Sequence, residues 1–327
     1  MEKRPEDHHD VHGSESANVD LKSYFTRGDK APIRTDGRLL GKGSFGKVYE
    51  GEWSENSGAA FSKWKKVAIK ATLKSANKEG RLTFMSEMEG AMLTYPKAPK
   101  STLRVLDVYL DHPTHWILVL EYAEYNLLSY LKAHTAAKVK DKAIEKVTRQ
   151  LSEEEILRVF FPLFRASRNL SKSGELHADI KPENILLVRE SDKLRPKLAD
   201  FGLYRSKRYA NFYTMQAGTP RYFPLEYLKR TNYKINTKHI ESLDAYALIL
   251  TLHECLMYPA RDYLLSSDRG YKKNKNPADM PFRTISEPLR LLLRTVLTPG
   301  AWYKHPLTIQ DLEPYIDALP NSKGWRS

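Results

Sequence analysis

The stretch LHADIKPENILL, residues 176–187, concentrates polar side chains that could carry out chemistry on a hydroxyl group. Asp179 could take the hydroxyl proton, Lys181 could neutralise a phosphoryl group in transfer, and Asn184 could ligate a cation. Pro182 rules out a plain helix, so a loop can turn these side chains to one face. Taken alone, the segment fits a polar surface turn equally well, because Asp-Ile-Lys-Pro-Glu-Asn is good turn chemistry.

A second candidate carboxylate stands in KLADFGLYR, residues 197–205. Asp200 follows a short apolar strand and precedes Phe-Gly. A carboxylate in this place suits Mg²⁺, which takes one or two protein oxygens together with phosphate oxygens. The alternative is an ordinary aspartate in a turn.

The stretch LGKGSFGKV, residues 40–48, has the pattern Gly-x-Gly-x-x-Gly-x-Val. Glycines without a Cβ let backbone N–H groups approach phosphates. A dinucleotide-binding fold would continue with a helix, whereas KVYEGEW is strand-like, so the pattern disfavours that fold. It also lacks the Gly-Lys-Ser/Thr of a P-loop, and alone it is weak support for any function.

Lys70 ends the strand-like VAIK, where a buried ammonium group needs an anion. The alternative is a surface lysine with a buried stem. Two glutamates on the following helical segment, Glu87 and Glu89, are candidate partners. We prefer Glu89 because its apolar neighbours Met92 and Leu93 have the cleaner helical spacing, which leaves Glu87 as an exposed charge.

The composition bounds the class of protein. The chain has 327 residues, 41% hydrophobic and 28% charged, which is typical of a globular protein with one large domain or two smaller ones. The single cysteine, Cys255, excludes an internal disulfide, and its apolar surroundings predict core packing. The longest apolar run, residues 245–252, is too short to span a membrane and predicts a buried helix. The start MEKRPEDHHD is not a secretory signal.

The net charge of +13 favours anionic partners, with solvated surface lysines as the alternative. The densest basic run, KKNKN at residues 272–276, lacks the interleaved aromatic residues of a nucleic-acid platform. The polar residues 1–33 predict a largely disordered tail. A metal site at His8, His9 and His12 is disfavoured because no cysteine lies nearby.

Hydrophobic periodicity predicts a small antiparallel sheet with one helix, followed by a helical half. We expect strands within residues 38–53, 65–73, 103–110 and 115–123, and a helix within residues 75–95. Further helices are expected at residues 126–138, 241–256, 287–297 and 307–319. Ser152 and Glu155 form a capping box for a helix that Pro162 should kink or split and that should end before Gly174. The charged residues 136–147 suggest an exposed extension.

In this order, the glycine turn, the lysine, Asp-x-Lys-x-x-Asn and Asp-Phe-Gly match the signature of protein kinases. From about Asp36 to about Leu319, the chain resembles a eukaryotic-type protein kinase. The resemblance implies an α+β, two-lobed fold with a β-rich lobe carrying one main helix, a larger helical lobe, and ATP between them. The expected divisions are a tail at 1–33, the small lobe at 34–122, the large lobe at 123–320 and a short tail at 321–327.

The resemblance also assigns roles. Asp179 would accept the substrate hydroxyl proton, with Lys181 beside it, and Asn184 and Asp200 would hold Mg²⁺. Lys70, held by Glu89, would bind the α- and β-phosphates. The full set of implied ATP-binding residues is Leu40, Gly41, Lys42, Gly43, Ser44, Phe45, Gly46, Lys47, Val48, Ala68, Lys70, Glu121, Ala123 and Leu186.

Within that set, Val48 and Ala68 would cover one face of adenine and Leu186 the other, while Glu121 and Ala123 would offer backbone groups. Leu120 would gate the pocket behind adenine.

The segment AGTPRYFPLEYL, residues 217–228, resembles the end of a kinase activation segment. By resemblance, Thr219 would contact Asp179 and Lys181, and Asp244 would brace the catalytic loop. Lys181 and the Gly-Thr pair resemble Ser/Thr kinases, so Ser/Thr acceptors are favoured while dual specificity stays open.

Two positions depart from the family pattern. Ala178 stands where an arginine of His-Arg-Asp normally holds a phosphorylated activation loop. We therefore hypothesise that activity does not need phosphorylation within residues 203–217, although Arg205, Lys207 and Arg208 remain there as cations. His305 stands where an arginine normally pairs with Glu226, so that contact should be weaker or pH-sensitive.

The leading hypothesis is an active, Mg-ATP-dependent Ser/Thr protein kinase without the arginine of the His-Arg-Asp motif. The alternatives are a catalytically inactive kinase-like binding module, which the presence of Lys70, Asp179, Asn184 and Asp200 disfavours, and a small-molecule kinase. A DNA-binding role rests only on net charge. Expected partners are protein substrates, with acidic ones favoured by the basic surface, and the default location is the cytoplasm, with the nucleus left open. The sequence does not indicate an oligomeric state.

Overall fold

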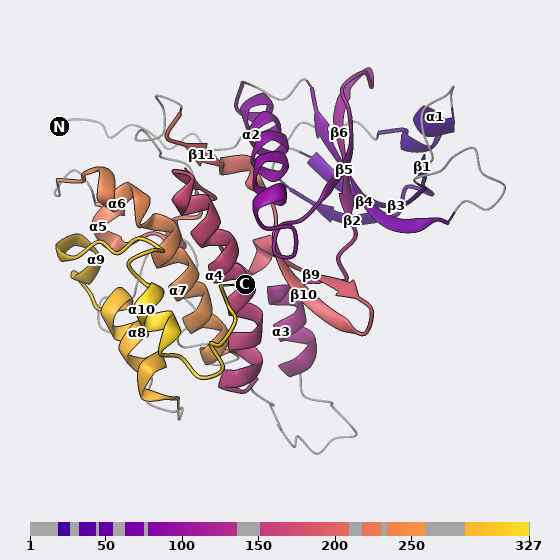
Figure 1. Cartoon of the computed structure of the whole chain (residues 1–327). Coiled ribbons are helices and arrows are strands. Elements are labelled where there is room, and N and C mark those ends of the chain that lie inside the picture. The colour runs from indigo at the N-terminus through magenta and orange to yellow at the C-terminus, as the bar shows by residue number, and fades with distance from the viewer. Residues whose placement is uncertain are drawn as a thin grey trace, which may run out of the picture. The chain divides into compact units, whose positions relative to one another are not determined.

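The computed structural model describes residues 19–26, 33–43, 46–54, 63–74, 78–135, 151–208, 218–229, 234–258 and 285–326. The chain divides into two compact units (Figure 1). The first unit comprises residues 1–80 and 107–119, and the second comprises residues 81–106 and 120–327. Several sequence-based predictions fall outside the described residues: the histidines of the tail, Ser44 and Phe45, the charged segment at 136–147 and the run at 272–276.

The first unit is built on an antiparallel sheet. Its strands are β1 (Ile33–Arg34), β2 (Leu39–Lys42), β3 (Gly46–Trp53), β4 (Lys65–Leu73), β5 (Val105–Tyr109) and β6 (His115–Glu121). The order is β1-β3-β4-β6-β5, with β2 paired to β3, and the ends of β5 and β6 belong to the second unit. On β4 the buried Val67, Ile69 and Ala71 alternate with the partly exposed Ala68 and Lys70, the period of a half-buried strand.

The prediction of a disordered tail is wrong for α1 (Leu21–Thr26). Leu21 and Phe25 lie one helical turn apart and are both buried. The Phe25 ring packs edge-on against Tyr109, with 5.3 Å between centroids. The Tyr24 hydroxyl donates a hydrogen bond to the Asp111 carboxylate. Two large apolar side chains in a polar segment were therefore enough to dock a short helix on the first unit.

The predicted helix of the small lobe is α2 (Lys78–Thr94), and from Arg81 onward it belongs to the second unit rather than the first. The reason is how the following chain is anchored. Leu103 N–H donates a hydrogen bond to the Leu198 carbonyl oxygen at 2.9 Å. In turn, Leu198 N–H donates to the Ser101 carbonyl oxygen at 2.8 Å. Lys97, in η1 (Tyr95–Lys97), pairs with the buried Glu175 at 2.8 Å. The grouping by contacts therefore differs from the expected lobe boundary at residue 122, which stays a prediction.

Helices dominate the second unit. Besides α2 they are α3 (Leu127–Thr135), α4 (Glu153–Lys172), α5 (Leu225–Leu228), α6 (Thr237–Glu241), α7 (Leu243–Met257), α8 (Glu287–Leu297), α9 (Ala301–Lys304) and α10 (Glu313–Asp317). The predicted capping box at the start of α4 is confirmed, since Ser152 and Glu155 exchange backbone-to-side-chain hydrogen bonds. Pro162 does not split α4, which runs unbroken and ends before Gly174, where φ is +71°.

Helix α7 is the centre of the helical core, because all fifteen of its residues are buried. Cys255 lies there at 2% exposure, and burial raises the pKa of its thiol, so the prediction of core packing is confirmed. The core also takes in Trp325, 4% exposed, whose indole N–H donates to Asp317 at 2.8 Å. The expected short C-terminal tail is therefore packed against the helical unit as far as residue 326.

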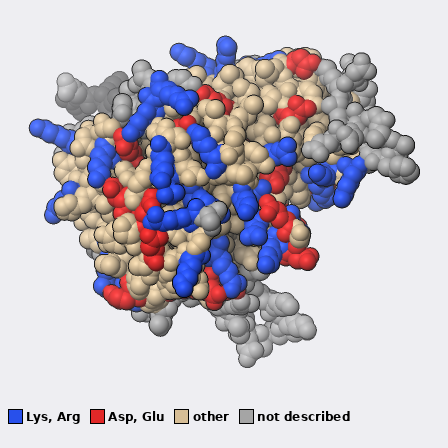
Figure 2. Space-filling model, in the orientation of Figure 1, with Lys and Arg blue, Asp and Glu red and all other residues tan. Residues whose placement is uncertain are grey.

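Short strands flank the loops that contain Asp179 and Asp200. β9 (Ile185–Glu190) and β10 (Lys193–Leu198) form a hairpin, and β7 (Tyr125–Asn126) pairs with β9. β8 (Glu175–Leu176) pairs with β11 (Arg205–Ser206). Among the described residues, no helix combines the length and apolar character needed to cross a membrane. On the face shown in Figure 2, Lys and Arg side chains are numerous and Asp and Glu side chains lie among them.

Candidate active site

The segment after β8 forms a loop whose backbone is fixed by one buried carboxylate. Asp244, near the start of α7, accepts hydrogen bonds from His177 N–H at 2.7 Å and from Ala178 N–H at 2.9 Å. Burial raises the pKa of Asp244, while the His177 ring and the two amide donors act in the opposite direction. The expected bracing role of Asp244 is therefore visible in the geometry.

Ala178 occupies the left-handed region, with φ of +69°. For an L-residue with a Cβ, this region raises the conformational free energy by roughly 1–2 kcal/mol. Its side chain is 3% exposed. Alanine is the smallest side chain that retains a Cβ, and the two hydrogen bonds to Asp244 hold the strained backbone in place. The sequence did not indicate this conformation, because neither neighbour is a glycine or a proline.

Asp179 is the centre of a hydrogen-bonded cluster. Its Oδ1 accepts from the Thr219 hydroxyl at 2.7 Å and from Thr219 N–H at 3.1 Å. Its Oδ2 accepts from Lys181 Nζ at 2.7 Å and Asn184 Nδ2 at 2.8 Å. Lys181 Nζ also donates to Thr219 Oγ1 at 2.6 Å. The predicted contacts of Thr219 with both residues are thus present, and four donors fix the orientation of one carboxylate.

His177 connects this loop to the segment that carries Asp200. Its Nδ1 accepts from Asp179 N–H at 3.3 Å, which leaves Nε2 to donate to the Ala199 carbonyl oxygen at 3.0 Å. The ring packs against Phe201 with 4.6 Å between centroids. Asp200 follows directly, with φ of +60°, and opens η3 (Phe201–Leu203). The two carboxylate-bearing segments are therefore held together through a buried histidine.

Asn184 and Asp200 offer oxygen ligands of the kind that Mg²⁺ prefers. Asn184 is buried, and its Nδ2 already donates twice to Asp179, so its amide oxygen is the atom left for a cation. No cluster of three or more His, Cys, Asp or Glu side chains suited to a metal occurs among the described residues. A cation held here would thus need further oxygens from water or a ligand, which is the usual situation for Mg²⁺ bound with phosphates.

Helix α2 approaches the Asp200 segment at a glycine. A Cβ on Gly90 would lie 2.8 Å from side-chain carbons of Phe201 and Tyr204. A side chain there would have to displace both rings, so Gly90 permits close packing between the helix and this segment. A glycine in the middle of a predicted helix was the signal that sequence analysis could have used.

The two glutamates of α2 differ in burial. Glu87 is 4% exposed, whereas Glu89 is half-buried. The pKa of Tyr204 is raised, first by burial, then by Glu175 and to a smaller extent by the charge of Glu89. The expectation that Glu87 is an exposed charge is wrong, because the apolar residues we used to set the register do not share one buried face: Met92 is 55% exposed. The ion pair between Lys70 and one of these two glutamates stays a prediction.

In the first unit, Lys70 stands opposite Val48 and Gly46 opposite Thr72 in the β3–β4 ladder. A Cβ on Gly46 would lie 2.3 Å from the Ala71 carbonyl oxygen, so the sheet itself requires glycine here. By contrast, a Cβ on Gly41 would have nothing within 4 Å. Gly43 N–H donates to the Gly46 carbonyl oxygen at 2.9 Å and closes the turn. Leu40 and Lys42 are exposed, and Lys47 and Ala68 are half-buried.

In the second unit, Glu121 N–H donates to the Arg104 carbonyl oxygen at 3.0 Å, and its carboxylate binds the buried Lys197 at 2.8 Å. Among the described residues, no backbone hydrogen bond of Ala123 to another loop or turn is found. Leu186 lies on β9, opposite Lys197 of β10.

Glu226 has a different partner from the one expected. Its Oε1 accepts from Gly300 N–H at 2.8 Å, while His305 is exposed. A backbone amide does not titrate, so this contact gives no reason for the predicted pH sensitivity.

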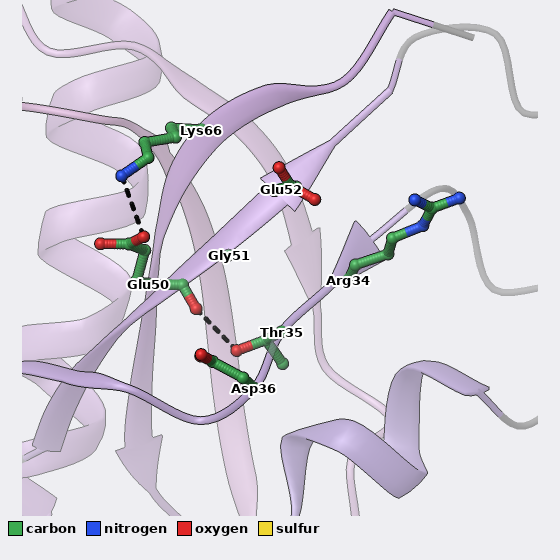
Figure 3. A pocket seen from close by; sticks show the side chains of 7 residues that line it. All are labelled: Arg34, Thr35, Asp36, Glu50, Gly51, Glu52 and Lys66. Carbon is green, nitrogen blue, oxygen red and sulfur yellow. Dashed lines mark hydrogen bonds and ion pairs between the residues drawn. The ribbon is translucent and has the colours of Figure 1, made fainter.

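A polar hollow of about 260 Å³ lies in the first unit and contains none of the predicted site residues (Figure 3). Lys66 Nζ and Arg38 pair with the Glu50 carboxylate at 3.0 and 3.6 Å. The Arg34 guanidinium is turned away, over the Trp64 ring at 3.7 Å. Opposite charges are already paired across this hollow, so it resembles a structural ion cluster more than a reaction site.

Comparison with known proteins agrees with these motifs. A family model described as protein tyrosine and serine/threonine kinase matches residues 35–282. The SNF1-like protein kinase ssp2 of Schizosaccharomyces pombe is 30% identical over 183 residues, which cover 56% of this chain and 27% of the relative. The CBL-interacting protein kinase 28 of Oryza sativa subsp. japonica is 28% identical over 311 residues, covering 89% and 62%. The chain thus spans between about a quarter and three-fifths of these relatives.

Proposed function

Because the chain belongs to the protein tyrosine and serine/threonine kinase family, we propose that it transfers the γ-phosphoryl group of Mg-ATP to serine and threonine hydroxyls of proteins. The observation that carries the proposal is the fixed carboxylate of Asp179, held by Thr219, Lys181 and Asn184. The two-lobed kinase fold, with a β-sheet unit and a helical unit, agrees with this assignment.

In this mechanism Asp179 orients the acceptor hydroxyl and takes its proton as the hydroxyl oxygen bonds to the γ-phosphorus. The bond from the γ-phosphorus to the bridging oxygen breaks, and ADP leaves. Lys181, 2.7 Å from Asp179 and 20% exposed, supplies positive charge to the phosphoryl group in transfer. Catalysis depends mainly on the positioning of the acceptor hydroxyl. This dependence explains why the Asp179 carboxylate accepts four hydrogen bonds that fix its orientation.

Asn184 and Asp200 would hold Mg²⁺, and their oxygens suit that ion. When bound, Mg²⁺ neutralises charge on the phosphate oxygens. Asp200 has a left-handed backbone and is the residue directly before η3. The next residue, Phe201, packs on the His177 ring, and this contact holds the Asp200 backbone in place.

The predicted nucleotide-binding residues keep the roles that the resemblance gives them. Residues 40–48 and Lys70 would bind the phosphates, and Val48 and Ala68 would contact one face of adenine. Leu186 would contact the other face of adenine, and backbone groups of Glu121 and Ala123 would meet its polar edge.

Serine and threonine are favoured as acceptors by the contact between Lys181 and Thr219. Both side chains also bind Asp179, so they determine the space that remains for an acceptor hydroxyl beside it. The names of the two relatives describe protein kinases and do not extend to the substrates of this chain.

We further propose that activity does not require phosphorylation within residues 203–217. Ala178 provides no guanidinium for a phosphate. Two acceptors of the segment are buried, Tyr204 at 3% and Ser206 at 2% exposure. Lys207 is already paired with Glu241 at 2.5 Å. Tyr209, Tyr213 and Thr214 lie outside the described residues, and Arg205 and Arg208 remain as cations.

The test is transfer of radiolabel from γ-labelled ATP with Mg²⁺ to a mixed panel of acidic and basic proteins, followed by phosphoamino-acid analysis. Wild type should label serine or threonine, and Asp179→Asn should lose at least about 10²-fold. Asp192→Asn, an exposed turn residue between β9 and β10, is the matched control and should behave as wild type. Nucleotide binding without any transfer would instead favour an inactive binding module.

Independence from loop phosphorylation is tested by replacing all five acceptors: Tyr204→Phe, Ser206→Ala, Tyr209→Phe, Tyr213→Phe and Thr214→Ala. We expect turnover near that of wild type. A collapse to the level of Asp179→Asn would contradict this part of the proposal, provided that circular dichroism shows a folded variant.

A further inference from the structure

A second ion cluster lies beside the catalytic loop. The Arg221 guanidinium donates through one terminal nitrogen to Glu254 Oε1 and to the Tyr222 hydroxyl, both at 2.7 Å. The Tyr222 hydroxyl donates to Glu254 Oε2 at 2.5 Å. Glu254, on α7, is 5% exposed and Tyr222 is 2% exposed, whereas the Arg221 side chain is 34% exposed. The cluster is therefore a buried carboxylate covered by a partly exposed cation.

Its position relates it to the reacting groups. Arg221 and Tyr222 belong to η5 (Pro220–Tyr222), which follows Thr219 directly, and Thr219 is bonded to Asp179. A second carboxylate, Glu183, lies in η2 (Pro182–Asn184), two residues after Lys181. After larger contributions from burial and from the contacts within the cluster, the charge of Glu183 helps to raise the pKa of Arg221, Tyr222 and Glu254. Arg221 is therefore bonded to one carboxylate, and a second lies within electrostatic reach of it on a segment that adjoins Lys181.

Among the described residues, this cluster holds two carboxylates and one guanidinium. Glu254 is bonded to Arg221, and Glu183 acts on it through its charge, while burial raises the pKa of Glu254. In the described residues, Glu183 Oε2 and Arg221 Nε are buried atoms without a hydrogen-bond partner. A carboxylate removed from water needs a cation, and removing one partner of such a pair leaves an uncompensated charge. Without Arg221, these acids would form a subsite for a cation supplied from outside.

We propose that Arg221 is a specificity-determining residue that fills this acidic subsite from within the chain. A lysine or arginine of a substrate then gains little from Glu183 and Glu254, because their charge is already partly compensated. Selection by a basic side chain near the acceptor is therefore switched off in this kinase. The inference rests on the proposed function, since it concerns the substrates of the same site.

The experiment is a positional scan with a neutral serine peptide and derivatives carrying one arginine at each of the four positions on either side of the serine. For wild type, kcat/KM should vary by less than about threefold across the scan. Arg221→Gln should raise kcat/KM for at least one arginine peptide about tenfold relative to the neutral peptide. That gain should vanish in R221Q/E183Q and R221Q/E254Q, each of which lacks one carboxylate.

A structural role alone would lower stability without changing peptide selectivity, so the ratio between peptides separates the two roles. A tenfold preference of wild type for any arginine peptide would overturn the inference, as would a folded Arg221→Gln enzyme whose selectivity is unchanged. Absence of transfer to every peptide by wild type would mark a failure of the proposed function instead.

Thermal stability tests the acidic subsite without relying on transfer to a peptide. Millimolar methylguanidinium should raise the melting temperature of Arg221→Ala, because it can occupy the place of the lost guanidinium. It should leave wild type and R221A/E254Q unchanged. Equal effects on all three proteins would contradict an acidic subsite at this place.

Discussion

The Ala178 amide donates a hydrogen bond of 2.9 Å to Oδ1 of Asp244, a residue 66 positions later in the chain. This contact joins the strained backbone of the catalytic loop to the most buried helix of the second unit. The same carboxylate receives the His177 amide on its other oxygen. The position of Asp179, the next residue, therefore depends on a carboxylate that takes no part in the chemistry.

Asp244→Asn should separate this positioning role from catalysis. Asparagine has one acceptor oxygen, so one of the two amides would face an NH₂ donor in a buried place. We expect a loss of about 1–3 kcal/mol in unfolding free energy and a fall in kcat of at least about tenfold, because Asp179 would shift. Urea unfolding and steady-state kinetics measure the two effects, with Asp192→Asn as control. Wild-type kcat in the variant would show that Asp244 does not position the loop.

A matched pair at Ala178 tests the strain at this residue. Ala178→Gly should change unfolding free energy by less than about 1 kcal/mol, because relief of the left-handed strain offsets the entropy of glycine. Ala178→Val should lose more than about 2 kcal/mol, since a β-branched residue at positive φ is strained and the site is buried. Equal stabilities of the two variants would mean that φ at this position is not positive in solution.

The glutamates of α2 offer a second matched pair. Because Glu87 is buried and Glu89 is half-buried, we expect the loss of the Glu87 charge to disturb activity more than the loss of the Glu89 charge. Glu87→Gln should lower kcat/KM at least about tenfold, and Glu89→Gln should stay within about threefold. Kinetics at varied ATP concentration would measure this difference. The reverse order would support Glu89 as the partner of Lys70, as the helical spacing predicts.

His253 gives the helical unit a predictable acid sensitivity. It lies on α7 at 3% exposure, and burial lowers its pKa from 6.5 to about 4. Below pH 6.5 the unfolded chain binds a proton that the folded chain does not, so stability falls with pH until about pH 4. The contribution approaches about 3 kcal/mol at the acid end. Unfolding at pH 7 and pH 5 should show a smaller difference for His253→Leu than for wild type, whereas equal differences would assign the effect to other groups.

The sequence alone was sufficient for the local elements. The strands, the capping box of α4 and the turn chemistry depend on residues within a few positions of one another, and these predictions agree with the structure. Asp179, Lys181 and Asn184 also lie within six residues, so their convergence on one face follows from a loop that Pro182 keeps out of a helix. The resemblance to protein kinases rests on motifs of this local kind, and the family match agrees with it.

Only the tertiary structure determined which distant groups meet. Thr219 reaches Asp179 across 40 positions, and Glu254 reaches Arg221 across 33, and neither distance has a signature in the sequence. Burial likewise distinguished Glu87 from Glu89, and the anchoring of the chain after α2 placed most of that helix with the second unit. Propensity and periodicity act over a few residues, whereas the free energy of a buried charge depends on whatever the fold brings beside it.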